Sequence, residues 1–163
     1  MKNNTKQKNK SIFYMKKALL QAKVAFKNNE VPIGAIIIDS DGHILSRAYN
    51  KIEKSGCQAA HAEMISIKRA CEKKGDWRLN GCTLYVTLEP CLMCLGLIQL
   101  SRLDKVVFGA ESPLFGTGIL KGQADSLAKT YAKNLKIEGG VCVDECAKLL
   151  QFFFSNQRKK KGG

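Results

Sequence analysis

Residues 83–94 read TLYVTLEPCLMC, a run of β-branched and aromatic side chains that leads directly into a proline and two cysteines. The first six, residues 83–88, have the composition of a buried strand. Pro90 favours the first turn of a helix, so we expect a helix over residues 91–100. The segment KVVF at residues 105–108 predicts a second short strand. A strand, a helix and a strand in this order predict a crossover unit of an α/β domain.

The rest of the chain continues this alternation of helices and strands. Apolar residues at helical spacing predict an amphipathic helix over residues 11–28. Residues 35–38 and 44–49, separated by a turn that contains the sequence DSDG, predict a hairpin. Further helices are expected over residues 60–71 and 143–154. We therefore predict a three-layer α/β/α fold around a central sheet, although this pattern does not define the order of the strands.

Length and composition indicate one ordinary domain. The chain has 163 residues, of which 45% are hydrophobic and 25% are charged, as in a globular protein with its own core. It contains no run of about 20 apolar residues that could span a membrane, and no apolar signal-peptide segment near its start. Its seven cysteines are an odd number, which is more typical of reduced thiols than of a disulfide framework. We therefore expect a cytoplasmic protein.

The formal net charge of +13 is concentrated at the two ends. Four lysines lie within residues 1–10, and one arginine and three lysines lie within residues 158–163. We expect these segments to be basic tails that flank a single domain over residues 11–157. Such tails could bind the phosphate backbone of a nucleic acid. Short lysine runs are at least as often solvated ends, so charge alone does not identify a partner.

Two short motifs contain the residue types of a metal site. The first is His61-Ala62-Glu63, and the second begins thirty positions after the histidine with Cys91 and ends with Cys94. Each motif alone is weak, because a lone histidine or a lone Cys-x-x-Cys pair has many structural explanations. Together they supply three ligands, the number that a catalytic zinc ion uses while its fourth position stays open for water. Cysteines three apart lie on one face of a helix, here near the positive N-terminal end, which stabilises thiolates.

The remaining candidate groups have different expected roles. Cys82 lies at the far end of a predicted strand that spans about 20 Å, so it cannot be a fourth ligand if that strand exists. Cys142 and Cys146 occur in a helical pattern of small residues, and we expect them in the core. Glu63 is placed where a carboxylate could take a proton from water and deliver it to a substrate nitrogen and leaving amine. An exposed helix glutamate is the simpler alternative for that residue.

The pattern His-x-Glu followed by Pro-Cys-x-x-Cys resembles the signature of zinc-dependent nucleobase deaminases. Over roughly residues 11–158 the sequence is similar to the tRNA adenosine deaminases in particular. The stretches that carry this similarity are EVPIGA at 30–35, YN at 49–50, TLYVTLEPC at 83–91, VVFGA at 106–110 and the segment 144–154. The resemblance implies a cytidine-deaminase-like fold with a five-stranded mixed sheet, usually in a homodimer. It also implies conversion of adenosine to inosine at the wobble position of a tRNA anticodon loop.

The resemblance further implies roles for individual residues. One zinc ion per subunit would be held by His61, Cys91 and Cys94. Glu63 would shuttle protons, and Asn50 matches an asparagine that contacts the flipped base. Phe153 and Phe154 match a pair of aromatic residues near the RNA, although an amphipathic helix would place at least one of them in the core.

The sequence departs from the family pattern in two loops. Residues 57–60 read CQAA, where the family commonly has Asp-Pro-Thr-Ala. Residues 111–118 read ESPLFGTG, where an acidic residue, a lysine and Thr-Gly-Ala are usual. Ser155 also replaces a basic residue that is common after the two phenylalanines. These changes leave the zinc ligands intact, so the target base is the property that they could alter.

Two other functions stay open on the sequence. A metabolic deaminase of free cytosine, guanine or cytidine would share the zinc site, but it would need neither basic ends nor the matching terminal helix. A non-catalytic, zinc-stabilised RNA-binding partner would have no use for Glu63. We therefore expect a hydrolytic enzyme that acts on the anticodon stem-loop of a tRNA.

Overall fold

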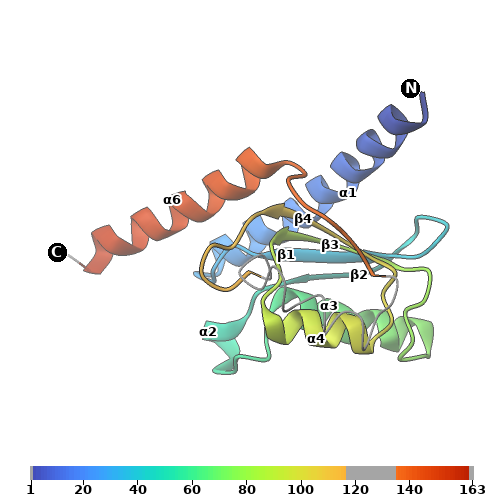
Figure 1. Ribbon diagram of the computed structural model, residues 1–163. Helices are drawn as coiled ribbons and strands as arrows, with labels where there is room; N and C mark the ends of the chain where they lie inside the picture. Colours follow the sequence, from blue (N-terminus) through green and yellow to red (C-terminus); the bar gives the residue numbers. More distant parts are fainter. Residues whose placement is uncertain (1, 117–134, 162–163) are drawn as a thin grey trace.

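A mixed β-sheet forms the middle layer of the computed structural model, which describes residues 2–116 and 135–161 (Figure 1). The described residues form five strands in the order β2-β1-β3-β4-β5. Their bounds are β1 (Gly34–Ile38), β2 (Ile44–Tyr49), β3 (Thr83–Leu88), β4 (Lys105–Ala110) and β5 (Lys136–Glu138). β1 is antiparallel to β2 and β3, whereas β3, β4 and β5 run parallel. The expected hairpin, crossover and five-stranded mixed sheet are thus confirmed.

Two pairs of helices cover the two faces of this sheet. α1 (Lys2–Lys27) and α6 (Val143–Lys161) lie on one face, and α3 (Ala62–Lys74) and α4 (Leu92–Leu100) lie on the other (Figure 1). The short helix α2 (Ile52–Ser55) connects β2 to α3. This arrangement confirms the predicted three-layer α/β/α architecture.

Alternate residues of the central strands build two separate cores. In β1 and β3, Ile36 and Tyr85 pack in the core beneath α1 and α6. Their neighbours Ile37 and Leu84 pack in the core beneath α3 and α4. Successive side chains of a strand point to opposite faces, so both sets are buried. Burial on both faces explains why these strands read as nearly continuous apolar runs.

The two outer helices are longer than predicted. α1 begins at Lys2 rather than near residue 11, and α6 continues to Lys161 rather than ending near residue 154. The basic segments at both ends are therefore helical where the structure describes them. Lysine, arginine and glutamine have good helix propensity, so a lysine run does not by itself end a helix. None of the described helices contains a stretch both long and apolar enough to cross a membrane.

Candidate active site

Two helices begin at the metal-ligating candidates. His61 is the N-cap of α3, where its carbonyl accepts the N–H of Ile65 at 3.1 Å. Cys91 is the N-cap of α4, and its carbonyl accepts the N–H of Leu95 at 2.8 Å. Cys94 is the third residue of the same helix, one position earlier than predicted, because the helix begins at Leu92 and Cys91 lies outside it. The ends of both helices therefore bring the histidine and the cysteine pair together from distant parts of the sequence.

The three side chains have the spacing of a zinc site. The His61 Nδ1 atom lies 3.4 Å from the Cys94 Sγ and 3.8 Å from the Cys91 Sγ. All three candidate ligand atoms fall within 4.8 Å of one another. Ordinary zinc bonds at tetrahedral angles separate a nitrogen from a sulfur ligand by about 3.5 Å and two sulfurs by about 3.8 Å. One imidazole and two thiols at these distances fit one zinc ion per chain.

The protonation of the cluster is already biased towards a thiolate. Hydrogen bonds with Cys94 and His61 lower the pKa of the Cys91 thiol to about 3. The hydrogen bond with Cys91 raises the pKa of His61. A hydrogen bond between Cys94 and Cys91, together with burial, raises the pKa of the Cys94 thiol. A metal ion at this position would compete with protons for both sulfur atoms, since a thiolate is the form of cysteine that binds metals.

Glu63 lies beside the cluster with its carboxyl group removed from water. Its side chain is 4% exposed, although it belongs to the first turn of α3. Burial raises the pKa of this carboxyl group. Within the part of the chain that the structure describes, its Oε2 atom has no hydrogen-bond partner. The alternative of an exposed surface glutamate is therefore wrong. A buried polar atom without a partner is costly unless a ligand satisfies it, so this oxygen atom is a candidate for contact with a ligand.

Asn50 contributes a second buried polar side-chain atom. It follows β2, and its backbone N–H donates to the Ile33 carbonyl at 3.0 Å. The next residue, Lys51, donates to the carbonyl of Ala60, which directly precedes His61. The Oδ1 atom of Asn50 is also buried without a hydrogen-bond partner among the described residues. The backbone contact therefore ties the Asn50 segment to the start of α3.

Phe153 is not brought to this cluster by any contact among residues 2–116 and 135–161. It is buried in α6, 5.9 Å from the ring of Phe26 and 5.5 Å from the ring of Phe154. Phe154 is partly exposed on the same helix. One of the two phenylalanines thus packs in the interior, as the amphipathic pattern indicates.

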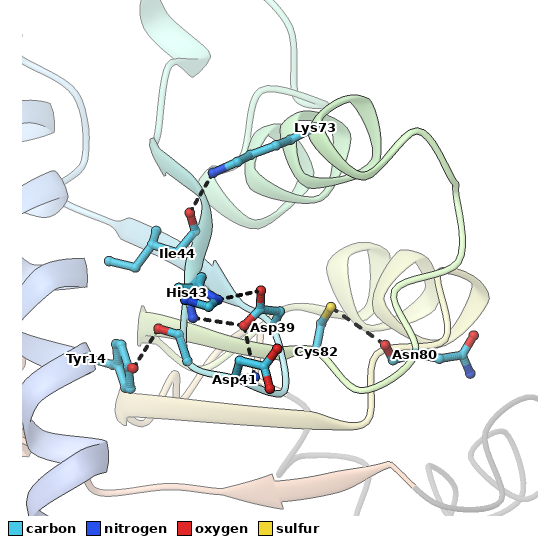
Figure 2. Close-up of polar contacts among 9 residues, drawn as sticks. Tyr14, Asp39, Asp41, His43, Ile44, Lys73, Asn80 and Cys82 are labelled. Atoms are coloured by element: carbon cyan, nitrogen blue, oxygen red, sulfur yellow. Dashed lines mark hydrogen bonds and ion pairs between the residues drawn. The ribbon is translucent and has the colours of Figure 1, made fainter.

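The other candidate ligands lie away from His61, Cys91 and Cys94, which together form the zinc-binding cluster. Cys82 is buried at the opposite end of β3 from Cys91, and its thiol is directed towards the carbonyl of Asn80 at 3.8 Å (Figure 2). Cys146 is buried in the core beneath α1 and α6, as expected. A second group of potential metal ligands, Asp39, Asp41 and His43, occupies the β1–β2 turn (Figure 2). Asp39 there accepts the backbone N–H groups of the other two residues, which accounts for the group as turn structure.

Glu89 is a residue that motif analysis did not assign. It is buried between β3 and Pro90, and its carboxylate accepts the backbone N–H of Ser112 at 3.0 Å. Its own backbone N–H donates to the carbonyl of Ala110 at 2.8 Å. The sequence contained one indication of a special role for Glu89. This charged residue directly follows a buried strand and directly precedes the Pro-Cys-x-x-Cys motif. Its partner lies 23 positions away, so the sequence did not reveal its role.

Comparison with known proteins agrees with this geometry. Residues 8–110 match the model of the cytidine and deoxycytidylate deaminase zinc-binding region. A tRNA-specific adenosine deaminase of Bacillus subtilis is 46% identical over 149 residues, which cover 91% of each chain. The chain belongs to the cytidine and deoxycytidylate deaminase family.

Further members of this deaminase family are similar along most of the chain. A tRNA-specific adenosine deaminase of Streptococcus pyogenes is 37% identical over 91% of this chain and 92% of its own. A solved structure from a study of A-to-I editing by tRNA:A34 deaminases superposes with a TM-score of 0.77 at 36% identity. That match covers 85% of this chain and 99% of the other. The family's zinc-binding region spans His61, Cys91 and Cys94, the same three residues that converge in the structure.

Proposed function

We propose that this protein is a hydrolytic, zinc-dependent deaminase that converts adenosine to inosine at the wobble position of a tRNA anticodon loop. The observation that carries the proposal is the convergence of His61, Cys91 and Cys94 beside the buried Glu63. The similarity of most of the chain to tRNA-specific adenosine deaminases supports the choice of substrate. A tRNA substrate is also consistent with a cytoplasmic location.

The three converging side chains would hold zinc, and Glu63 would move the protons. Zinc bound there would lower the pKa of a water molecule to about 7, which makes hydroxide available at neutral pH. The Glu63 carboxylate accepts the proton that this water gives up. It would pass this proton to the purine ring. Once the C–O bond has formed, it would take the remaining proton of the attached hydroxyl and pass it to the leaving amine, so that the C–N bond breaks and ammonia leaves. The raised pKa of Glu63 suits a group that must both take and give a proton near neutral pH.

Asn50 would orient the base that enters this site. Its buried Oδ1 atom can accept a hydrogen bond, and among the described residues that atom has no partner. A purine would have to be extruded from the RNA to reach such an enclosed group. Phe153 would act less directly, since it is packed against Phe26 in the interior and could support the helix surface that faces the RNA.

A homodimer is the assembly that we propose for the enzyme. α4 buries Cys94, Leu95 and Ile98, but its opposite side exposes large apolar side chains. These exposed residues are Leu92, Met93 and Leu100. An apolar helix face of this kind is typical of a surface that a partner subunit covers.

The proposed interface can be tested by placing a charge on it. We expect Leu100→Lys to halve the particle mass in light scattering, whereas Leu20→Lys on α1 should leave the mass unchanged. Equal masses for the wild type and both variants would contradict this interface.

The activity can be tested by comparing RNA with free compounds. Purified protein is incubated with tRNA transcripts, with an isolated anticodon stem-loop, and with free adenosine, cytidine and guanine. We expect inosine, which sequencing detects as guanosine, at one position of the anticodon loop. Preferred turnover of a free base or nucleoside would replace the proposal with a metabolic deaminase. Binding of tRNA with zinc but without any deamination would instead support the non-catalytic alternative.

A further inference from the structure

The loop that follows β4 is attached directly to the zinc-binding cluster. Gly116 forms an isolated antiparallel bridge with Cys91. Ser112 donates its backbone N–H to the carboxylate of Glu89, and it accepts the N–H of Gly116 at 2.8 Å. Residues 111–116 are therefore held by the two residues that flank Pro90. Any group carried by this loop stays close to the zinc ligand Cys91.

The attachment leaves no room for a side chain at position 116. A Cβ atom on Gly116 would overlap the Glu89 carboxylate and the Ser112 carbonyl. The glycine thus allows the loop backbone to approach the buried acid. Glu89 and Ser112 are both buried, so the base of the loop is well anchored.

The tip of the same loop is apolar and exposed. Leu114 is 77% exposed and Phe115 is 72% exposed, the two most exposed large apolar side chains among the described residues. Exposed aromatic residues elsewhere have ring or cation partners: Phe13 contacts Tyr14, and Trp77 contacts Arg78. Within residues 2–116 and 135–161, Phe115 has no such partner. An anchored loop that presents an unpartnered aromatic ring one residue from Gly116 is typical of a binding surface.

We propose that Phe115, supported by Leu114, stacks against a nucleobase adjacent to the target adenosine and so determines which RNA loops the enzyme accepts. This inference rests on the proposed function. Extruding one base from a loop leaves its neighbours without their stacking partner. Proteins that recognise single-stranded RNA commonly offer aromatic side chains to such bases. Phe115 is next to Gly116, the bridge partner of Cys91, so its backbone lies close to the site that the target base would enter.

The stacking contact can be tested by substituting the ring. We expect Phe115→Ala to raise the KM for the anticodon stem-loop by roughly 5- to 150-fold, the range for the loss of one stacked base. The kcat at saturating RNA and the zinc content should change little, because the ring does not take part in proton transfer. Phe115→Tyr should keep the wild-type KM. Trp77→Ala is the matched control, since Trp77 is a half-exposed aromatic residue beyond the C-terminal end of α3, away from His61.

The RNA partner of the ring can be identified with modified substrates. Stem-loops that lack the base on either the 5′ or the 3′ side of the target are compared with the intact RNA. One of them should raise the KM of the wild-type enzyme to the level of Phe115→Ala, and the substitution should add no further loss on that RNA. Additive losses on both RNAs, or an unchanged KM for Phe115→Ala, would overturn the inference. Dissociation of a dimer by the substitution would also overturn it, because the loop would then contact a second subunit. If the wild-type protein deaminates no RNA, it is the proposed function that has failed.

Discussion

At the scale of single residues, the chemistry depends on groups that the fold has removed from water. Glu63 sits in the first turn of a helix, a position where a carboxylate would normally be solvated and stabilised by the helix dipole. Its burial raises its pKa and leaves one oxygen without a partner among the described residues. An arrangement that costs folding free energy is expected where a site needs a carboxyl group able to carry a proton.

Replacing the carboxyl group with an amide of the same shape should separate folding from catalysis. We expect Glu63→Gln to lower kcat by at least about 100-fold, because the amide cannot accept and return a proton. Zinc content and melting temperature should stay close to those of the wild type, since Glu63 is not among the converging ligands. Metal analysis, calorimetry and an inosine assay are run on the same preparation. Loss of zinc would make Glu63 a ligand, and retained activity would remove it from the mechanism.

The zinc ligands can be tested at the two cysteines. The purified chain should contain about one zinc ion per subunit, and Cys91→Ser or Cys94→Ser should lose it, because a hydroxyl is a much poorer ligand than a thiolate. Cys82→Ala is the matched control, since Cys82 is buried at the other end of β3. Elemental analysis measures the result directly. Full zinc occupancy in the double variant Cys91→Ser/Cys94→Ser would contradict the assignment.

At the scale of elements, close contact between α1 and β1 depends on one glycine. A Cβ atom at Gly34 would overlap the carbonyl oxygen of Ala18 and the amide nitrogen of Ala22, both in the backbone of α1. Gly34 also donates its N–H to the Thr87 hydroxyl at 3.1 Å. The helix and the strand can therefore approach each other only because position 34 has no side chain.

Filling this contact should loosen one layer of the fold. We expect Gly34→Ala to reduce the free energy of unfolding by about 1–3 kcal/mol, the usual cost of overpacking a well-packed interior. For a domain of this size the melting temperature should fall by roughly 2–12 °C. Calorimetry measures the fall, and hydrogen exchange should show that α1 loses protection before α3 does. An unchanged melting temperature would mean that α1 can move away from β1 without cost.

The elements differ in how well the sequence predicted them. The strand over residues 83–88 was predicted with its observed bounds, because burial on both faces favours β-branched, aromatic and aliphatic residues along the whole segment. β5 was not predicted, since its sequence Lys-Ile-Glu is too short for any periodicity. α2 has only four residues and was missed for the same reason. The order of the strands depends on contacts between distant segments, which no local pattern contains.

The sequence predicts those parts of the candidate site that lie in short motifs. The convergence of His61, Cys91 and Cys94 was predictable because two short motifs contain all three candidate ligands. Glu63 was identified as a candidate, but its burial was not, because burial depends on how α3 packs against the sheet. The role of Glu89 was not predicted, since its partner Ser112 belongs to a different strand connection.

At the scale of the whole molecule, the two basic ends are not equivalent. The C-terminal half of α6 extends towards the end of the molecule where α2 lies, whereas the N-terminus of α1 lies at the opposite end (Figure 1). Contacts connect α6 with the end of α1, and the loop after α1 with α2. Phe153 packs on Phe26 near the end of α1, and Glu30 accepts the backbone N–H groups of Glu53 and Lys54 in α2. A shallow pocket of about 330 Å³ between α1 and α6 is lined by Phe26, Phe153, Lys159 and Lys160, among others. We therefore expect the basic end of α6, rather than the basic end of α1, to contact the RNA.

Neutralising equal numbers of lysines at the two ends should show this difference. We expect Lys159→Gln/Lys160→Gln to raise the KM for the anticodon stem-loop and to reduce its dependence on salt. Each phosphate contact contributes roughly 0.7–0.9 to the slope of log affinity against log salt, so the slope should fall by about 1–2. Lys8→Gln/Lys10→Gln removes the same charge from exposed positions near the start of α1 and should change neither quantity. The measurement is KM at several salt concentrations for the wild type and both variants. Equal losses for the two pairs would mean that net charge attracts the RNA without a defined contact surface, because a uniform field acts on the charge and not on its position.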